Sequence, residues 1–147
     1  NQGNRKRKTI DRGQSWEEAL SVRQGTKRLR FTVDSGATKH FVNAHVPLED
    51  RQSHQSSAVA AGGREYAITE KGTCAGETVD GSTITFEALR CNAFTKNLFS
   101  VHEAAKNGTR TVFDWDHSYL ENTTTGERTP LQRTRNGWEL QLAQEAA

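Results

Sequence analysis

The chain has 147 residues, of which 33% are hydrophobic, and it carries a net charge of +2 at pH 7. This length suits a single domain, and no stretch approaches the roughly 20 apolar residues that a membrane-spanning helix requires. Two cysteines are too few for a secreted disulfide framework, and no apolar segment near the N-terminus has the pattern of a signal peptide. We therefore expect an intracellular, cytoplasmic protein, with a nuclear location as the alternative.

The basic residues concentrate at the start of the chain. Residues 1–30 contain nine lysines and arginines against three acidic residues, whereas the remainder contains eleven against fifteen. We interpret residues 1–28 as a basic, flexible arm, in which Ser15–Leu20 could form a short helix with a capping box. The run Arg5–Lys8 indicates either a solvated linker or a patch for nuclear localisation or RNA binding. This arm could make a weak nucleic-acid contact.

The first predicted strand begins at Leu29. Residues Leu29–Asp34 alternate apolar and polar side chains with a period of two, which is typical of a half-buried strand. The strand leads directly into a turn at Ser35-Gly36-Ala37.

Two hairpins are predicted after this turn, because Gly62-Gly63 and Asp80-Gly81 are strong turn signals between apolar runs. Their strands are, in chain order, Ala58–Ala61, Arg64–Ile68, Thr69–Val79 and Ser82–Arg90. The polar stretch His54–Ser57 precedes them.

The hydrophobic period changes after the second hairpin. Apolar residues within Leu98–Lys106 recur with helical spacing, which predicts one short amphipathic helix that ends at Asn107-Gly108. Further short strands are predicted at Thr111–Phe113, Tyr119–Leu120 and Trp138–Leu142. Together these elements predict a mainly β fold with one short helix, arranged as a small β-barrel or an orthogonal sandwich.

Asp34 is the candidate for chemistry, because an acidic residue at the end of a buried strand is held firmly and can point into an open cleft. Gly36 permits a tight turn that a side chain would obstruct, and Ser35 offers a hydroxyl to a partner loop. The structural alternative is an Asx-type turn that only ends the strand.

The order of these features resembles the retropepsin family of aspartic proteases. The shared features are an apolar strand, Asp34-Ser35-Gly36-Ala37, a glycine-tipped hairpin and an apolar pair that opens a short helix. The segment Asn97–Val101, which reads Asn-Leu-Phe-Ser-Val, is similar to the protease region of Ty1/copia-type retrotransposon polyproteins. The resemblance covers Leu29 to about Gly108, and it implies a retropepsin-like closed β-barrel with a glycine-tipped flap.

The resemblance also implies roles for individual residues and segments. Residues 29–108 would form the protease domain, and residues 109–147 would form C-terminal strands or a linker toward the next polyprotein module. Asp34 would be the catalytic residue. The other assigned residues are Ser35, Gly36 and Ala37 in the active-site loop, Ala61, Gly62, Gly63 and Arg64 in the flap, and Leu98, Phe99 and Ser100 in the segment packed behind the loop.

Aspartic proteolysis needs two carboxyl groups that share a proton, one as general base and one as general acid. The chain contains one Asp-Ser-Gly motif and is too short for two such lobes, so the second Asp34 must come from an identical chain. The expected protein is a homodimeric endopeptidase that processes its own Gag-Pol polyprotein, in the cytoplasm within virus-like particles. Its substrates are extended peptide segments, and neither a metal nor an organic cofactor is implied.

Two other classes of function remain open. One is a catalytically silent, retropepsin-like dimerisation or binding module. The other is an RNA-binding β domain led by the basic arm. This second class is disfavoured, because the remaining chain is acidic on balance and lacks interleaved aromatic residues. His40, His45 and Glu49 could be read as metal ligands, but their spacing matches no standard zinc pattern, which favours solvated loop histidines.

Overall fold

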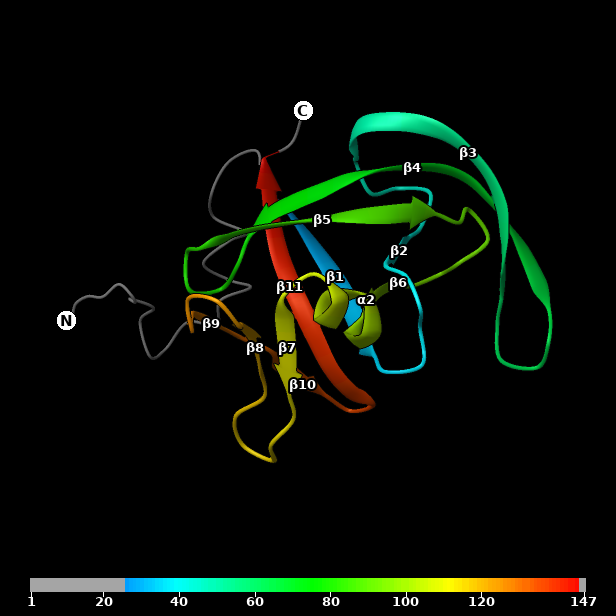
Figure 1. Ribbon diagram of the computed structural model, residues 1–147. Helices are drawn as coiled ribbons and strands as arrows, with labels where there is room; N and C mark the ends of the chain where they lie inside the picture. Colours follow the sequence, from blue (N-terminus) through cyan, green and yellow to red (C-terminus); the bar gives the residue numbers. More distant parts are fainter. Residues whose placement is uncertain (1–25, 146–147) are drawn as a thin grey trace.

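The computed structural model describes residues 26–145, most of which lie in β-strands and a few in one short helix (Figure 1). This confirms the predicted mainly β composition with one helix. The expected helix at Ser15–Leu20 and most of the basic arm lie outside the described residues. Among residues 26–145, no helix is long and apolar enough to cross a membrane.

The strands of residues 26–145 form two sheets. The larger sheet has eight strands in the order β10-β11-β1-β6-β2-β5-β4-β3, and the smaller has three in the order β7-β8-β9. The elements are β1 (Thr26–Asp34), β2 (Phe41–Val42), β3 (Glu49–Val59), β4 (Glu65–Glu77), β5 (Thr83–Arg90), β6 (Asn97–Ser100), α2 (Val101–Lys106), β7 (Thr109–Val112), β8 (Tyr119–Asn122), β9 (Arg128–Pro130), β10 (Gln132–Thr134) and β11 (Gly137–Glu145).

Strand β1 lies between β11 and β6, and it contributes the centre of the core. Its alternating apolar residues Leu29 and Phe31 are buried and pair with Leu142 and Leu140 of the antiparallel β11. Within the described residues the strand already includes Thr26–Arg28, ahead of the predicted start at Leu29, because its pairing with β11 extends into these polar residues. The C-terminal strand β11 and the aspartate-bearing strand β1 therefore share one sheet.

Both predicted hairpins are present, around Gly62-Gly63 and Asp80-Gly81. The hairpin of β3 and β4 is longer than predicted, and it arches away from the rest of the sheet in Figure 1. Strand β3 includes the polar stretch His54–Ser57, which backbone pairing with β4 holds extended although it buries little. The predicted strands Arg64–Ile68 and Thr69–Val79 form one continuous strand, β4. It is continuous because it pairs first with β3 and then with β5 along its length.

The helix prediction was wrong at its start. Residues Asn97–Ser100 form β6, which pairs in parallel with the end of β1, and α2 begins only at Val101. Apolar residues at Leu98 and Phe99 serve a strand here, although their spacing to Val101 and Ala104 also fits a helix. A short apolar run is ambiguous in this way.

The larger sheet also makes a contact between β11 and β4, through the pair Ala143 and Glu77. A glycine at position 76 permits this approach, since a Cβ atom there would lie 2.8 Å from the Leu142 Cβ. Cys74 and Cys91 are buried free thiols, and burial raises the pKa of Cys74 to about 12.

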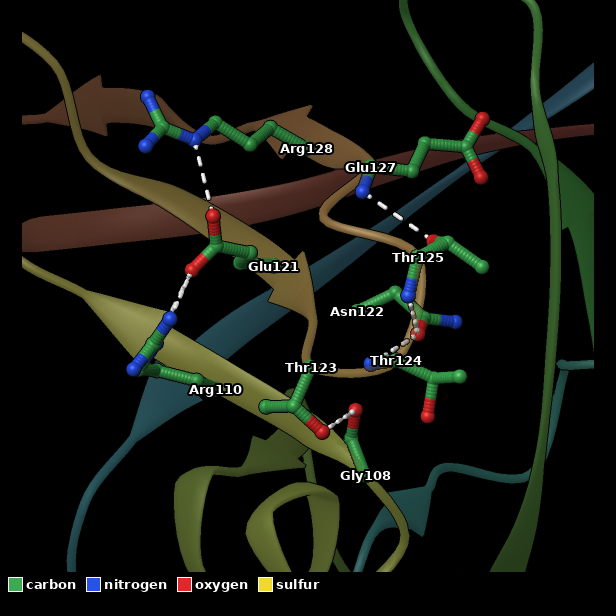
Figure 2. A network of polar contacts seen from close by, with 9 residues as sticks. All are labelled: Gly108, Arg110, Glu121, Asn122, Thr123, Thr124, Thr125, Glu127 and Arg128. Atoms are coloured by element: carbon green, nitrogen blue, oxygen red, sulfur yellow. Dashed lines mark hydrogen bonds and ion pairs between the residues drawn. The ribbon is translucent and has the colours of Figure 1, made fainter.

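A carboxylate on the central strand of the smaller sheet connects that strand to both of its neighbouring strands. Glu121 of β8 lies between Arg110 of β7 and Arg128 of β9, and it makes ion pairs with both guanidinium groups (Figure 2). The turn that follows β8 is closed by Asn122, whose side-chain oxygen accepts hydrogen bonds from the amides of Thr124 and Thr125 at 2.9 and 3.0 Å.

Candidate active site

Asp34 is the last residue of β1, and its side chain is half-buried. Its Oδ1 atom accepts a hydrogen bond from the amide of Gly36 at 2.7 Å. A Cβ atom on Gly36 would lie 3.3 Å from that oxygen, so any larger residue would crowd the carboxylate. The Asx-type turn considered as the structural alternative is thus present, and it fixes one carboxylate oxygen rather than excluding a chemical role.

Ser100 ties the loop that follows Asp34 to helix α2. It is fully buried and pairs with Asp34 in the parallel register of β1 and β6. Its hydroxyl donates to the carbonyl oxygen of Ala37 at 2.6 Å and accepts from the amide of Glu103 at 2.9 Å, which makes Ser100 the N-cap of α2. One hydroxyl therefore satisfies both the loop and the helix N-terminus.

His40 is a supporting residue whose role the sequence did not indicate. It is 3% exposed, and its Nδ1 atom accepts a hydrogen bond from the amide of Ser100 at 2.9 Å. Its ring packs against Phe86 and Phe99, with centroid distances of 4.7 and 4.5 Å. Burial lowers the pKa of His40 to about 4, so the imidazole stays neutral near pH 7 and remains an acceptor. The prediction of a solvated loop histidine was wrong at this position.

The other residues of β6 also support the loop that follows Asp34. The amide nitrogen of the Asn97 side chain donates to the carbonyl oxygen of Arg30 at 3.0 Å, and its oxygen accepts from the amide of Asn43 at 2.9 Å. Phe99 is buried in the main core, whereas Leu98 is half-buried on the opposite face. The three residues Leu98, Phe99 and Ser100 thus face different surroundings, and each contacts a different part of the site.

A groove of about 750 Å³ lies between the Asp34 loop and the β3–β4 hairpin. Asp34, Gly36 and Ala37 line one wall, and residues 56–61 line the other. The floor is a small apolar cluster that is separate from the main core. Its groove-lining members are Phe41, Ala58, Ile68, Leu89, Phe94 and Leu98. Among the described residues that line the groove, Asp34 is the only carboxylate.

The hairpin tip has the backbone that its glycines predict. The amide of Gly63 donates to the carbonyl oxygen of Ala60 at 3.0 Å, and the amide of Ala60 donates to the carbonyl oxygen of Arg64 at 2.9 Å. Gly62 and Gly63 have φ values of 91° and 83°, which residues other than glycine rarely adopt. Ala61 lines the groove, whereas Gly62, Gly63 and Arg64 lie beyond its lining. The Arg64 guanidinium stacks over Tyr66 at 5.5 Å.

Ser35 is exposed in the turn and does not line the groove of one chain. The alternative metal ligands are not brought together: His40 is buried against Ser100, while His45 and Glu49 are exposed. Within residues 26–145, no three side chains of histidine, cysteine, aspartate or glutamate are placed to hold a metal ion.

No protein-family model matches the sequence, and no curated protein matches it significantly.

Proposed function

We propose that the protein is a homodimeric aspartic endopeptidase of the retropepsin type, to which each copy contributes Asp34. The observation that carries this proposal is the groove that has Asp34 on one wall and a glycine-tipped hairpin on the other. An extended peptide could lie in such a groove and pair with the hairpin as an added strand. The hairpin would then close over the substrate as a flap.

The single carboxylate that one chain contributes to the groove supports a dimer. Peptide hydrolysis by carboxylates requires two of them, one to activate water and one to protonate the scissile carbonyl oxygen. The described part of one chain supplies a single carboxylate to the groove, so the second must come from another copy across a two-fold axis. Neither copy of Asp34 would hold a fixed role, because a close carboxylate pair titrates as a unit.

The braces behind the loop fit this chemistry. Asn97 and Ser100 bind backbone carbonyls before and after Asp34, and His40 accepts a hydrogen bond from the amide of Ser100, so together they would hold the carboxylate at a fixed depth. A catalytic group gains from such positioning, because small displacements from productive geometry lower the rate strongly. The exposed hydroxyl of Ser35 would be available to the partner loop on the two-fold axis.

The apolar floor of the groove indicates the kind of substrate. Aliphatic and aromatic residues line it beneath Asp34, so we propose that cleavage occurs beside apolar side chains of an extended segment. The contact of β11 with β4 supports a closed barrel as the frame of the site. By its resemblance to Ty1/copia-type proteases, the enzyme would process the polyprotein that contains it.

The experiment that tests this function compares the wild type with Asp34→Asn on a precursor in which the chain keeps its flanking sequences. We expect cleavage between about pH 5 and 7 in the wild type and a loss of at least roughly 10²-fold in the variant. Equal cleavage by both proteins would remove the role given to Asp34. A stable dimer without cleavage in either protein would favour the catalytically silent binding module.

A further inference from the structure

A second part of the surface combines exposed aromatic rings with clustered positive charge. Two hollows of about 620 and 540 Å³ meet at the turn between β10 and β11, where they share Thr134, Arg135 and Trp138. Neither hollow shares a residue with the groove that Asp34 lines. We call the two hollows together the Arg135 surface.

The smaller hollow presents an aromatic side chain that is exposed yet held in place. Trp115 is 75% exposed, and Phe113 beside it is 49% exposed. The backbone amide of Trp115 donates to the carboxylate of Asp114 at 2.7 Å, and its carbonyl oxygen accepts from Arg133 at 3.1 Å. Phe113 and Trp115 together form an exposed aromatic patch in this hollow, and such patches commonly mark interaction sites.

Arg133 organises the aromatic rings of this hollow. Its guanidinium lies 4.5 Å from the centroid of the Trp115 ring and 6.0 Å from that of Trp138. Arg133 and Trp138 are paired residues of β10 and β11, so their side chains leave the sheet on the same face. The result is a preformed stack of an arginine with two tryptophans, in which the Trp115 ring stays largely open to solvent.

The larger hollow is strongly basic. The described side chains that line it include five lysines and arginines against one acidic residue, Glu139. Part of this charge is engaged within the chain, since Arg30 lies 3.6 Å from the Glu139 carboxylate and the Lys27 ammonium donates to the carbonyl oxygen of His45 at 3.0 Å. The basic residues are Lys27, Arg28, Arg30, Lys96 and Arg135. This positive charge contrasts with the acidic balance of residues 31–147 taken as a whole.

We infer that the Arg135 surface binds single-stranded nucleic acid. Lysines and arginines of the larger hollow would neutralise phosphates, and unpaired bases would stack on Trp115. A proline-rich peptide also fits exposed aromatic rings, but it brings no negative charge to five cations. Duplex nucleic acid has the charge but keeps its bases stacked inside. The adjoining basic and aromatic hollows therefore favour a single strand.

Fluorescence anisotropy with a labelled oligouridylate of about 15 nucleotides tests this inference, since single-strand sites span roughly 4–16 nucleotides. The full chain carries Asp34→Asn, so that binding is separated from the proposed peptidase function. Trp115→Ala should weaken binding about tenfold without changing its salt dependence, and Trp115→Phe should restore most of it. Arg135→Ala and Lys96→Ala should each reduce the slope of log K against log salt by about 0.7.

Lys106→Ala is the matched control for Lys96→Ala, because Lys106 is an exposed lysine outside both hollows. Thermal unfolding shows that each variant is folded before binding is measured. The inference is overturned if Trp115→Ala binds as tightly as its parent. It is also overturned if deletion of residues 1–14 abolishes binding while the surface variants have no effect. Trp115-dependent binding of a proline-rich peptide, with no binding of the oligouridylate, would assign the surface to a peptide instead.

Discussion

The hydroxyl of Ser100 donates a hydrogen bond to the carbonyl oxygen of Ala37 at 2.6 Å, across 63 positions of the chain. Both residues are buried, and the same hydroxyl caps helix α2. The loop that carries Asp34 is therefore tied to a helix N-terminus as well as to its own strand. If Asp34 is catalytic, the positioning of its loop depends on this serine.

Replacing Ser100 with alanine should lower the free energy of unfolding by about 1–3 kcal/mol, because it removes the cap and leaves the buried carbonyl of Ala37 without its donor. Urea denaturation measures this change. Ser53→Ala is the control, since Ser53 is exposed on β3 and should change stability by less than about 0.5 kcal/mol. Equal stability of the two variants would contradict the structural role of Ser100.

His40 should make the protein less stable in acid. Burial lowers the pKa of His40 to about 4 from an ordinary 6.5. Between these two pH values, His40 is therefore protonated in the unfolded chain but neutral in the folded chain. The contribution of His40 to stability is therefore full above pH 6.5 and is lost as the pH decreases toward 4, by a total on the order of 3 kcal/mol. Denaturation at a series of pH values measures the loss.

Other groups titrate in the same range, so the wild type is compared with His40→Asn, whose side-chain oxygen could still accept from the amide of Ser100. The pH slope should be smaller in this variant. His102→Gln serves as the control, because His102 is exposed on α2 and should leave the slope unchanged. A slope that His40→Asn does not alter would show that His40 is not the group responsible.

The glycines of the hairpin tip allow a specific test of the proposed flap. Gly62 and Gly81 have φ values of 91° and 86°, and a Cβ atom on either would meet nothing within 4 Å. Alanine at each position should therefore cost a similar amount of stability, about 1–2 kcal/mol, through backbone strain alone. Gly62→Ala should also lower peptidase activity, whereas Gly81→Ala, in the other hairpin, should not. Equal activity of the two variants would argue against a flap.

Glu121 should stabilise the smaller sheet in a pH-dependent way. Hydrogen bonds from Arg110 and Arg128 hold the pKa of Glu121 below its ordinary value (Figure 2). The stabilisation is thus present above the ordinary pKa of glutamate and is lost as the pH falls through the lower, folded value. Glu121→Gln should lower the Tm at pH 7 and reduce this acid sensitivity. The exposed Glu87→Gln is the control, and an equal effect would contradict the role of Glu121.

Local patterns predicted much of the architecture. The period-two alternation of Leu29–Asp34 and the glycine turns of both hairpins correspond to strands and turns of the structure, because each pattern depends on neighbours in sequence. The same holds for the alternation within β5, where Phe86 is more buried than its neighbours Thr85 and Glu87. Such features need no knowledge of distant contacts.

Features that depend on distant pairing were missed. Residues Leu98–Ser100 were assigned to a helix, and their parallel pairing with β1 makes them part of strand β6. The polar strand β3 has no apolar alternation, so nothing local indicates its full length. His40 gave no signal either, because its acceptor role depends on the amide of Ser100, which lies 60 positions away in the sequence. Trp115 and Arg133 likewise meet only through the folded sheet.

The most direct test of the central claim is a subunit-mixing experiment. Wild-type chains and Asp34→Asn chains are mixed in equal amounts, allowed to exchange, and assayed on the same peptide substrate. If each active site takes Asp34 from two copies, random pairing leaves roughly one quarter of the dimers fully wild type, and activity should fall to about that fraction of an undiluted wild-type sample. Activity should also fall on dilution. An activity of about one half in the mixture, unchanged on dilution, would show that each chain acts alone and would contradict the shared site.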